Sequence, residues 1–183
     1  MKKLKITEMH RLSVEQYKES DKTPLVVVLD NVRSLYNVGS VFRTADAFRL
    51  SGVCLCGITA RPPHPEIHKT ALGAEDSVDW KYFEQTEDCV EWLRQEGYTI
   101  FAIEQCEGST MLNEMKNEEL RMKNEGLSLA VVLGNEVKGV QQSVIDMCDG
   151  CLEIPQYGTK HSMNVSVTAG IVIWELHNRL LRS

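Results

Sequence analysis

Short apolar runs separated by polar segments are the feature of this 183-residue sequence that most restricts its fold. Strands are expected where β-branched and other apolar residues follow one another, at residues 25–29, 52–56, 98–103, 127–133 and 151–154. Runs that are apolar on both faces are typical of a parallel sheet covered by helices on each side. The sequence therefore predicts a mainly parallel central sheet.

Helical periodicity occupies the intervals between these runs. Helices are expected at residues 38–48, 86–96, 141–147 and 164–181. Asn37 is the expected N-cap of the first helix, and the last helix is apolar nearly all round until His177, which predicts deep burial of its first half. Strands that alternate with helices indicate an α/β fold, a parallel sheet flanked by helices.

The chain divides into an arm and one domain. The polar residues 1–23 predict a helical arm, and residues 24–183 predict a single domain of ordinary size. Within that domain, the acidic stretch 107–124 is the expected surface excursion.

Composition limits the function classes. The net charge of −6, from 20 basic and 26 acidic residues, argues against broad nonspecific RNA binding, because phosphate contacts usually leave a basic footprint. No apolar run approaches the roughly 20 residues that span a bilayer, so no membrane association is expected. The six cysteines lie in or beside apolar segments and lack the spacing of zinc fingers. We expect them to be reduced, in a cytoplasmic protein that binds no metal.

Three polar loops begin where predicted strands end, which is where open α/β sheets bind ligands. The first, residues 30–43, contains Asn37, Gly39 and Arg43. The second, residues 133–139, places two glycines around Asn135 and Glu136, so that backbone amides can face a ligand. The third, residues 154–164, ends in Ser-x-Asn at the start of the last helix. Taken alone, each loop also has a plain structural interpretation as a turn or a helix cap.

Two common nucleotide-binding motifs are excluded. The second loop lacks the GK[ST] ending of a Walker A loop, and no stretch has the G-x-G-x-x-G spacing of the dinucleotide fingerprint. A Rossmann-type small-molecule enzyme is therefore disfavoured.

The order and spacing of the three loops resemble a known family. Asn-x₅-Arg, then Leu-Gly-Asn-Glu-x₂-Gly, then Ile-Pro-x₂-Gly-x₃-Ser-x-Asn resemble the three motifs of the SpoU/TrmH branch of the SPOUT methyltransferases. The resemblance covers residues 24–181 and implies a deep trefoil knot near the C-terminus, with residues 133–163 in its loops. The third motif commonly reads Ser-Leu-Asn and here contains Met163, a nearly volume-conserving change.

This resemblance implies an activity and a set of residues. The implied reaction transfers a methyl group from S-adenosylmethionine to a ribose 2′-hydroxyl of tRNA or rRNA and leaves S-adenosylhomocysteine, in a homodimer that packs through the knot region and uses no metal. The implied catalytic positions are Asn37, Arg43, Glu136, Ser162 and Asn164. The implied cofactor-binding positions are Leu133, Gly134, Asn135, Ile154, Pro155 and Met163. Basic loop residues that could contact RNA phosphates are Arg33, Arg61, Lys69, Lys138 and Lys160.

Two rival functions remain open. One is a related SPOUT enzyme that methylates a base, and the other is a cofactor-binding RNA assembly factor without turnover. The Asn37/Arg43 and Ser162-x-Asn164 sets favour ribose over base methylation. The presence of Arg43 and Asn164 favours an enzyme over a binding protein, because a protein without turnover has no need of both. Arg43 itself is expected to position phosphate and stabilise charge, since an arginine rarely gives up its proton.

Overall fold

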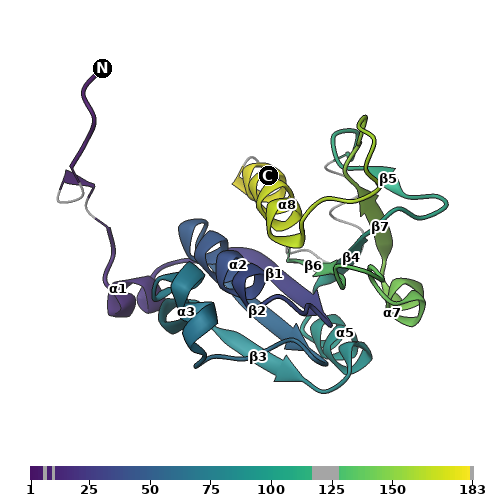
Figure 1. The fold of residues 1–183 in the computed structure, drawn as a ribbon, viewed down its shortest axis with the longest axis horizontal. Coiled ribbons are helices and arrows are strands. Elements are labelled where there is room, and N and C mark those ends of the chain that lie inside the picture. Colours follow the sequence, from purple (N-terminus) through teal and green to yellow (C-terminus); the bar gives the residue numbers. More distant parts are fainter. Residues whose placement is uncertain (6–7, 10, 117–127, 182–183) are drawn as a thin grey trace.

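The fold is built on one parallel sheet (Figure 1). The computed structural model describes residues 1–5, 8–9, 11–116 and 128–181. Its seven strands lie in the order β3-β2-β1-β6-β4-β7-β5, and every pairing between them is parallel, which confirms the predicted α/β class. The strands are β1 (Thr23–Asp30), β2 (Leu50–Cys56), β3 (Trp80–Phe83), β4 (Thr99–Ile103), β5 (Thr110–Met111), β6 (Leu129–Leu133) and β7 (Gly150–Glu153).

Helices cover both faces of the sheet. They are α1 (Val14–Glu19), α2 (Leu35–Ala47), α3 (Pro65–Ala71), α4 (Ala74–Ser77), α5 (Thr86–Gln95), α7 (Gln142–Met147) and α8 (Val165–Leu181). On β1, Leu25 and Leu29 belong to the core cluster that includes residues of α2, α3 and α8. Val26 and Val28 belong to a second cluster with residues of α5 and α7. The central strands are therefore buried on both sides, which is why they are apolar without alternation.

Several short elements were not predicted from the sequence. Strand β3 is a four-residue edge strand whose side chains are exposed or half-buried, so it lacks a continuous apolar run. Helices α3 and α4 are too short for a helical period to be recognised.

Helix α2 begins earlier than predicted. Its N-cap is Ser34, whose hydroxyl accepts a hydrogen bond from the Asn37 amide at 3.3 Å. The prediction that Asn37 is the N-cap was therefore wrong. Asn37 lies in the first turn of the helix, where its side-chain amide contacts other loops.

The predicted deep burial of the first half of α8 was also wrong for this chain by itself. Val165, Ala169 and Val172 are buried. The opposite face exposes three large apolar side chains at helical spacing: Val167 at 53%, Ile171 at 39% and Trp174 at 58%. Helix α8 therefore has an apolar face with no partner in the described part of the chain.

The N-terminal arm is only partly helical. Among its described residues, helix α1 is the one α-helix, and a capping box between Ser13 and Gln16 begins it. Tyr17 is 5% exposed and belongs to the main core cluster, so this helix packs on the domain. Strand β1 begins at Thr23, one residue before the predicted domain boundary, and the division into arm and domain stays a prediction.

The predicted surface excursion at residues 107–124 contains structured parts. It includes β5 and the buried side chains of Leu112 and Met115, while residues 117–124 lie outside the described residues. No helix in the described ranges is long and apolar enough to cross a membrane.

Candidate active site

The polar loops meet at the carboxyl edge of the sheet, where a buried carboxylate anchors them. Asp30, the last residue of β1, is fully buried and accepts hydrogen bonds from the Thr86 hydroxyl at 2.6 Å and the Gln141 amide at 3.1 Å. It also accepts from the side-chain amide of Asn31 at 2.8 Å. Sequence reasoning did not single out Asp30. The sequence feature that indicates it is its position, a charged residue directly after the first apolar run.

The loop after β6 is a tight turn that requires its two glycines. The backbones of Asn135 and Gly139 exchange two hydrogen bonds, of 3.0 and 2.9 Å. A Cβ atom on Gly134 would lie 2.1 Å from the carbonyl carbon of Gly139, and Gly139 itself has a positive φ of 67°. The side chain of Asn135 accepts hydrogen bonds from the amides of Val137 and Lys138, which closes the turn from inside.

A second anchor lies at the end of β4. Glu104 accepts a hydrogen bond from the Val140 amide at 3.1 Å, and the next residue, Gln105, donates from its side chain to the His161 carbonyl at 2.9 Å. Strand β4 lies between β6 and β7 in the sheet, so these two residues join the second loop to the third. Both were missed in the sequence, although Glu104, like Asp30, directly follows an apolar strand.

A chain of hydrogen bonds connects one residue from each of the three motifs. The Glu136 carboxylate accepts from the amides of Arg33 and Ser34, both at 3.0 Å, and from the side-chain amide of Asn37 at 3.2 Å. The side-chain oxygen of Asn37, Oδ1, in turn accepts a hydrogen bond from the side-chain amide of Asn164 at 3.1 Å. Glu136, Asn37 and Asn164 therefore form one network, which we call the three-motif network.

Glu136 is held in its ionised form. Partial burial raises the pKa of its carboxyl group, but the hydrogen bonds from Arg33, Ser34, its own amide and Asn37 together outweigh burial and leave the pKa below its usual range. A carboxylate that accepts several N–H donors is stabilised as the anion. Glu136 is thus suited to hold the first loop in place.

This arrangement predicts a pH effect on stability. Because the folded-state pKa of Glu136 is lowered, its contribution to stability is present above the unfolded value, about 4.3, and is lost as pH falls through the folded pKa. The melting temperature of the native protein should therefore fall more between pH 5 and pH 3 than that of Glu136→Gln. Equal falls in both proteins, measured by thermal unfolding across this range, would contradict the assignment.

Asn164 also caps helix α8. Its side-chain oxygen, Oδ1, accepts hydrogen bonds from the backbone amide and the hydroxyl of Ser166, at 2.9 and 2.6 Å. The interpretation of the third loop as a helix cap therefore holds for Asn164. Ser162 is exposed and has no hydrogen-bond partner among the described residues, so the structure does not bring it into the three-motif network.

Arg43 lies on α2, about a turn and a half after Asn37, with its side chain exposed. It donates no hydrogen bond to any described residue, so its guanidinium group is available to a ligand. The five basic residues proposed for RNA contact are exposed as well, and none forms an ion pair with a described residue: Arg33, Arg61, Lys69, Lys138 and Lys160.

The residues expected to bind the cofactor follow the ends of β6 and β7 or precede α8. Leu133 is buried at the end of β6, and Gly134 and Asn135 follow it half-buried. Ile154, Pro155 and Met163 are half-buried in the third loop. Half-buried apolar side chains beside a few polar groups are typical of small-molecule sites. The described residues include no group of three or more metal-ligating side chains that could hold a metal ion.

Comparison with known proteins identifies the family. The model of the SpoU rRNA methylase family matches residues 24–174. The chain belongs to this family. Within the SpoU relatives, a TrmH-family protein of Staphylococcus saprophyticus is 30% identical over 166 residues, which is 91% of this chain and 63% of the relative. The 23S rRNA (guanosine-2'-O-)-methyltransferase RlmB of Coxiella burnetii is 28% identical over 162 residues, 88% of this chain and 61% of that protein.

Solved SpoU structures share the fold. The AdoMet-bound rRNA methyltransferase from Sinorhizobium meliloti superimposes with a TM-score of 0.76 at 26% identity, over 93% of this chain and 62% of that one. This chain therefore spans less than two thirds of the length of these relatives.

Proposed function

We propose that this SpoU-family chain transfers a methyl group from S-adenosylmethionine to a ribose 2′-hydroxyl of tRNA or rRNA. The observation that supports this reaction best is the three-motif network, which joins Glu136, Asn37 and Asn164 at one edge of the sheet. Arg43 is exposed on the same helix as Asn37. The names of the similar proteins from Coxiella burnetii and Sinorhizobium meliloti support the reaction and the cofactor.

The cofactor fits the loops that follow β6 and β7. Leu133, Gly134 and Ile154 would hold the adenosine part with backbone groups, and Met163 would pack against it. When bound, S-adenosylmethionine supplies an already activated methyl group. The protein therefore has to align the acceptor hydroxyl and help it lose its proton.

Arg43 is suited to aligning the acceptor and to stabilising its oxygen as the proton leaves to solvent. Its guanidinium group stays protonated in proteins, so it acts as a fixed positive charge and a forked donor toward a phosphate. Bound to the phosphate beside the target ribose, it would position the hydroxyl and stabilise the oxygen as negative charge develops there. Glu136 and Asn37 would keep the first loop and α2 in place while this happens.

Methyl transfer to separated RNA pools tests this function. The purified chain would be incubated with labelled S-adenosylmethionine and either total tRNA or rRNA, and the digested products would be scanned for 2′-O-methylnucleosides. Label in such a nucleoside, absent with Arg43→Ala, supports the proposal. Label in a methylated base would replace it with base methylation, and cofactor binding without product in either pool would replace it with a binding protein.

The exposed face of α8 supports a homodimer through the knot region. Val167, Ile171 and Trp174 lie at i, i+4 and i+7, so they form one apolar stripe on the helix surface. A second copy of this chain is the partner that the family resemblance implies. The knot itself stays a prediction, as does the cytoplasmic location, which the six free cysteines favour.

A charge on this stripe should prevent association. Ile171→Lys places a cation where apolar surface would be buried, and we expect the molecular mass in solution to fall from that of a dimer to that of the monomer. Light scattering after size-exclusion chromatography measures the change. Leu4→Lys is the matched control, because Leu4 is a 58% exposed apolar residue in the N-terminal arm. A native protein that is already monomeric at micromolar concentration would refute the dimer.

A further inference from the structure

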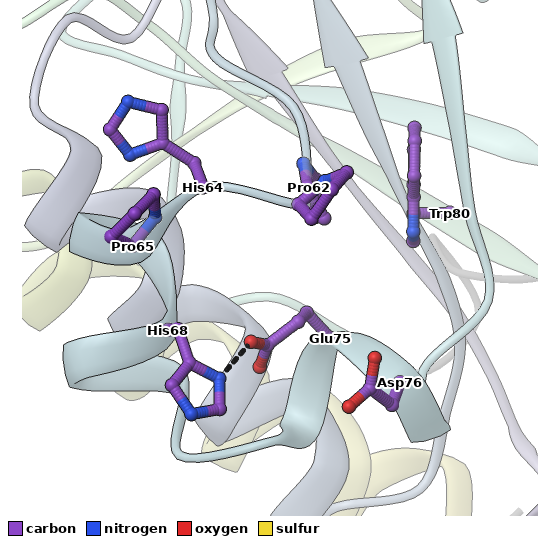
Figure 2. A pocket seen from close by; sticks show the side chains of 8 residues that line it. Pro62, His64, Pro65, His68, Glu75, Asp76 and Trp80 are labelled. Carbon is purple, nitrogen blue, oxygen red and sulfur yellow. Dashed lines mark hydrogen bonds and ion pairs between the residues drawn. The ribbon is translucent and has the colours of Figure 1, made fainter.

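A pocket of about 480 Å³ lies between α3, α4 and the first residue of the edge strand β3 (Figure 2). None of the residues of the three-motif network lines it, and neither does any residue assigned to the cofactor. Its lining residues are Pro62, Pro63, His64, Pro65, His68, Glu75, Asp76 and Trp80. The volume lies within the range of about 300–1,000 Å³ that is typical of small-molecule pockets.

The walls of this pocket suit a flat ring. Trp80 is 38% exposed and stands at one side of the pocket, with Pro62 on the loop beside it (Figure 2). Pro63 and Pro65 line the pocket as well. Unstacked RNA bases are commonly held by stacking on aromatic side chains and by hydrogen bonds to their edges. Trp80 can provide such a stacking surface, since it is the only aromatic ring among the pocket residues, apart from the two imidazoles.

The floor of the pocket has hydrogen-bond acceptors that lack donors. The Glu75 side chain is 8% exposed, and its Oε1 atom lies 2.6 Å from Nδ1 of His68. Its other oxygen, Oε2, is buried and has no partner among the described residues. The exposed Asp76 carboxylate likewise accepts no hydrogen bond from the described side chains. A buried acceptor without a donor is unfavourable, so a ligand whose N–H group reaches Oε2 through a small movement of the Glu75 side chain would be favoured here.

The negative charge of these two carboxylates also disfavours certain classes of ligand. Two carboxylates repel a phosphate or another anion at this point. No group of three metal-ligating side chains occurs in the described ranges, so the imidazoles and carboxylates here do not form a metal site. A neutral ring with N–H donors matches both the walls and the floor, and an amino group offers two such hydrogens where a ring imide offers one.

The pocket is fixed to the helix that presents Arg43. The Ser77 hydroxyl of α4 donates to Asp46 at 2.7 Å, and Asp46 lies one turn after Arg43 on α2. On α3, the Thr70 hydroxyl donates to the Tyr36 carbonyl at 3.0 Å. Helix α3 can approach α2 this closely because residue 39 is a glycine and has no Cβ atom. A Cβ atom at this position would lie only 2.1 Å from the Thr70 hydroxyl.

Two basic residues are sequence neighbours of pocket residues. Arg61 directly precedes the first pocket proline, and its guanidinium carbon lies 4.2 Å from the centre of the Tyr82 ring. Lys69 follows His68 on α3 and is exposed. Cations next to pocket residues in the sequence are candidates to contact the phosphates of an RNA strand whose base entered the pocket.

We propose that this pocket binds an unstacked nucleobase with an exocyclic amino group, from a nucleotide of the RNA substrate other than the one that is methylated. Adenine, cytosine and guanine have such an amino group, and uracil does not. This proposal rests on the proposed function, because that function makes RNA the ligand. Binding of the base itself needs no turnover and can be tested separately.

Binding of short single-stranded RNA tests the pocket without the reaction. Hexamers of adenylate, cytidylate and uridylate would be titrated into the full-length protein, with fluorescence anisotropy of a terminal label as the readout. We expect Trp80→Ala to weaken binding of the adenylate and cytidylate hexamers about tenfold, the usual effect of removing one stacked base. Trp80→Phe should restore most of the affinity, because it keeps an aromatic face.

Glu75→Gln tests the acceptors, because it keeps the size of the side chain and replaces the unpartnered oxygen by a donor. It should weaken binding of the adenylate and cytidylate hexamers more than binding of the uridylate hexamer, because uracil brings a single ring N–H and no amino group. Lys81→Ala is the control, since Lys81 neighbours Trp80 on β3 but lies over the Trp92 ring, outside the pocket.

The outcomes separate this proposal from the proposed function. In methylation assays, the Trp80 and Glu75 variants should raise KM for the RNA and leave kcat near that of the native protein. If Trp80→Ala bound all three hexamers with unchanged affinity, the proposal that the pocket binds a base would be overturned, even if the native protein methylates RNA. A native protein that methylates nothing, but whose hexamer binding depends on Trp80, would retain the pocket and refute only the reaction.

Discussion

Replacing Arg43 with alanine is expected to reduce kcat for methyl transfer by about 10²–10³-fold, the usual effect of removing one preorganised charge-stabilising group. Cofactor affinity should change by less than about twofold, because Arg43 is exposed and holds no other described residue in place. Initial rates with labelled methyl donor and calorimetric titration of S-adenosylmethionine measure the two quantities.

The lysine variant is the informative companion. Arg43→Lys keeps the positive charge but loses the planar fork that grips a phosphate with two bonds. Its kcat should lie between those of the alanine variant and the native enzyme. Turnover near the native rate in Arg43→Ala would remove Arg43 from the mechanism altogether.

Replacing Gly134 with alanine is expected to abolish cofactor binding. The new methyl group would lie 2.1 Å from both the Gly139 carbonyl carbon and the Val140 amide nitrogen, which are backbone atoms and cannot rotate away. The turn from Asn135 to Gly139 must open, and Glu136 would then leave the amides of the first loop. The cofactor loop would then be displaced, and the strain should lower stability by roughly 1–3 kcal/mol.

Calorimetric titration of S-adenosylhomocysteine and thermal unfolding would measure these losses. Gly158→Ala is the matched control for stability, because a Cβ atom there would meet nothing within 4 Å. If Gly134→Ala bound the cofactor with native affinity, the turn would not be part of the cofactor site.

The sequence predicted the central layers well because burial on both faces leaves a clear record. Strand β6 must be apolar at every position, since its alternate side chains face two different helix layers. Edge strand β3 has no such requirement, and its exposed Trp80 gave no strand signal. Local patterns therefore identify the elements with the most neighbours and miss those at the margin of the sheet.

The candidate site was predicted by motif order, but its internal contacts were not. Nothing in the spacing of Asn37 and Glu136 says that one donates to the other, because that contact depends on how the loops are brought together in space. The anchors Asp30 and Glu104 were missed for the same reason, since a carboxylate after a strand can equally well face water. The burial of α8 was overestimated because an apolar surface can be covered either by the same chain or by another copy.

The three-motif network has a consequence for the order of events in folding. Its two side-chain hydrogen bonds join residues that are 99 and 127 positions apart, so the site closes only when the beginning and the end of the domain have met. Contacts between distant parts of a chain lose the most conformational entropy on formation and tend to slow folding. Synthesis proceeds from the N-terminus, so Asn164 is made long after the residues of α2, and the three-motif network can be completed only once α8 has been made and has docked.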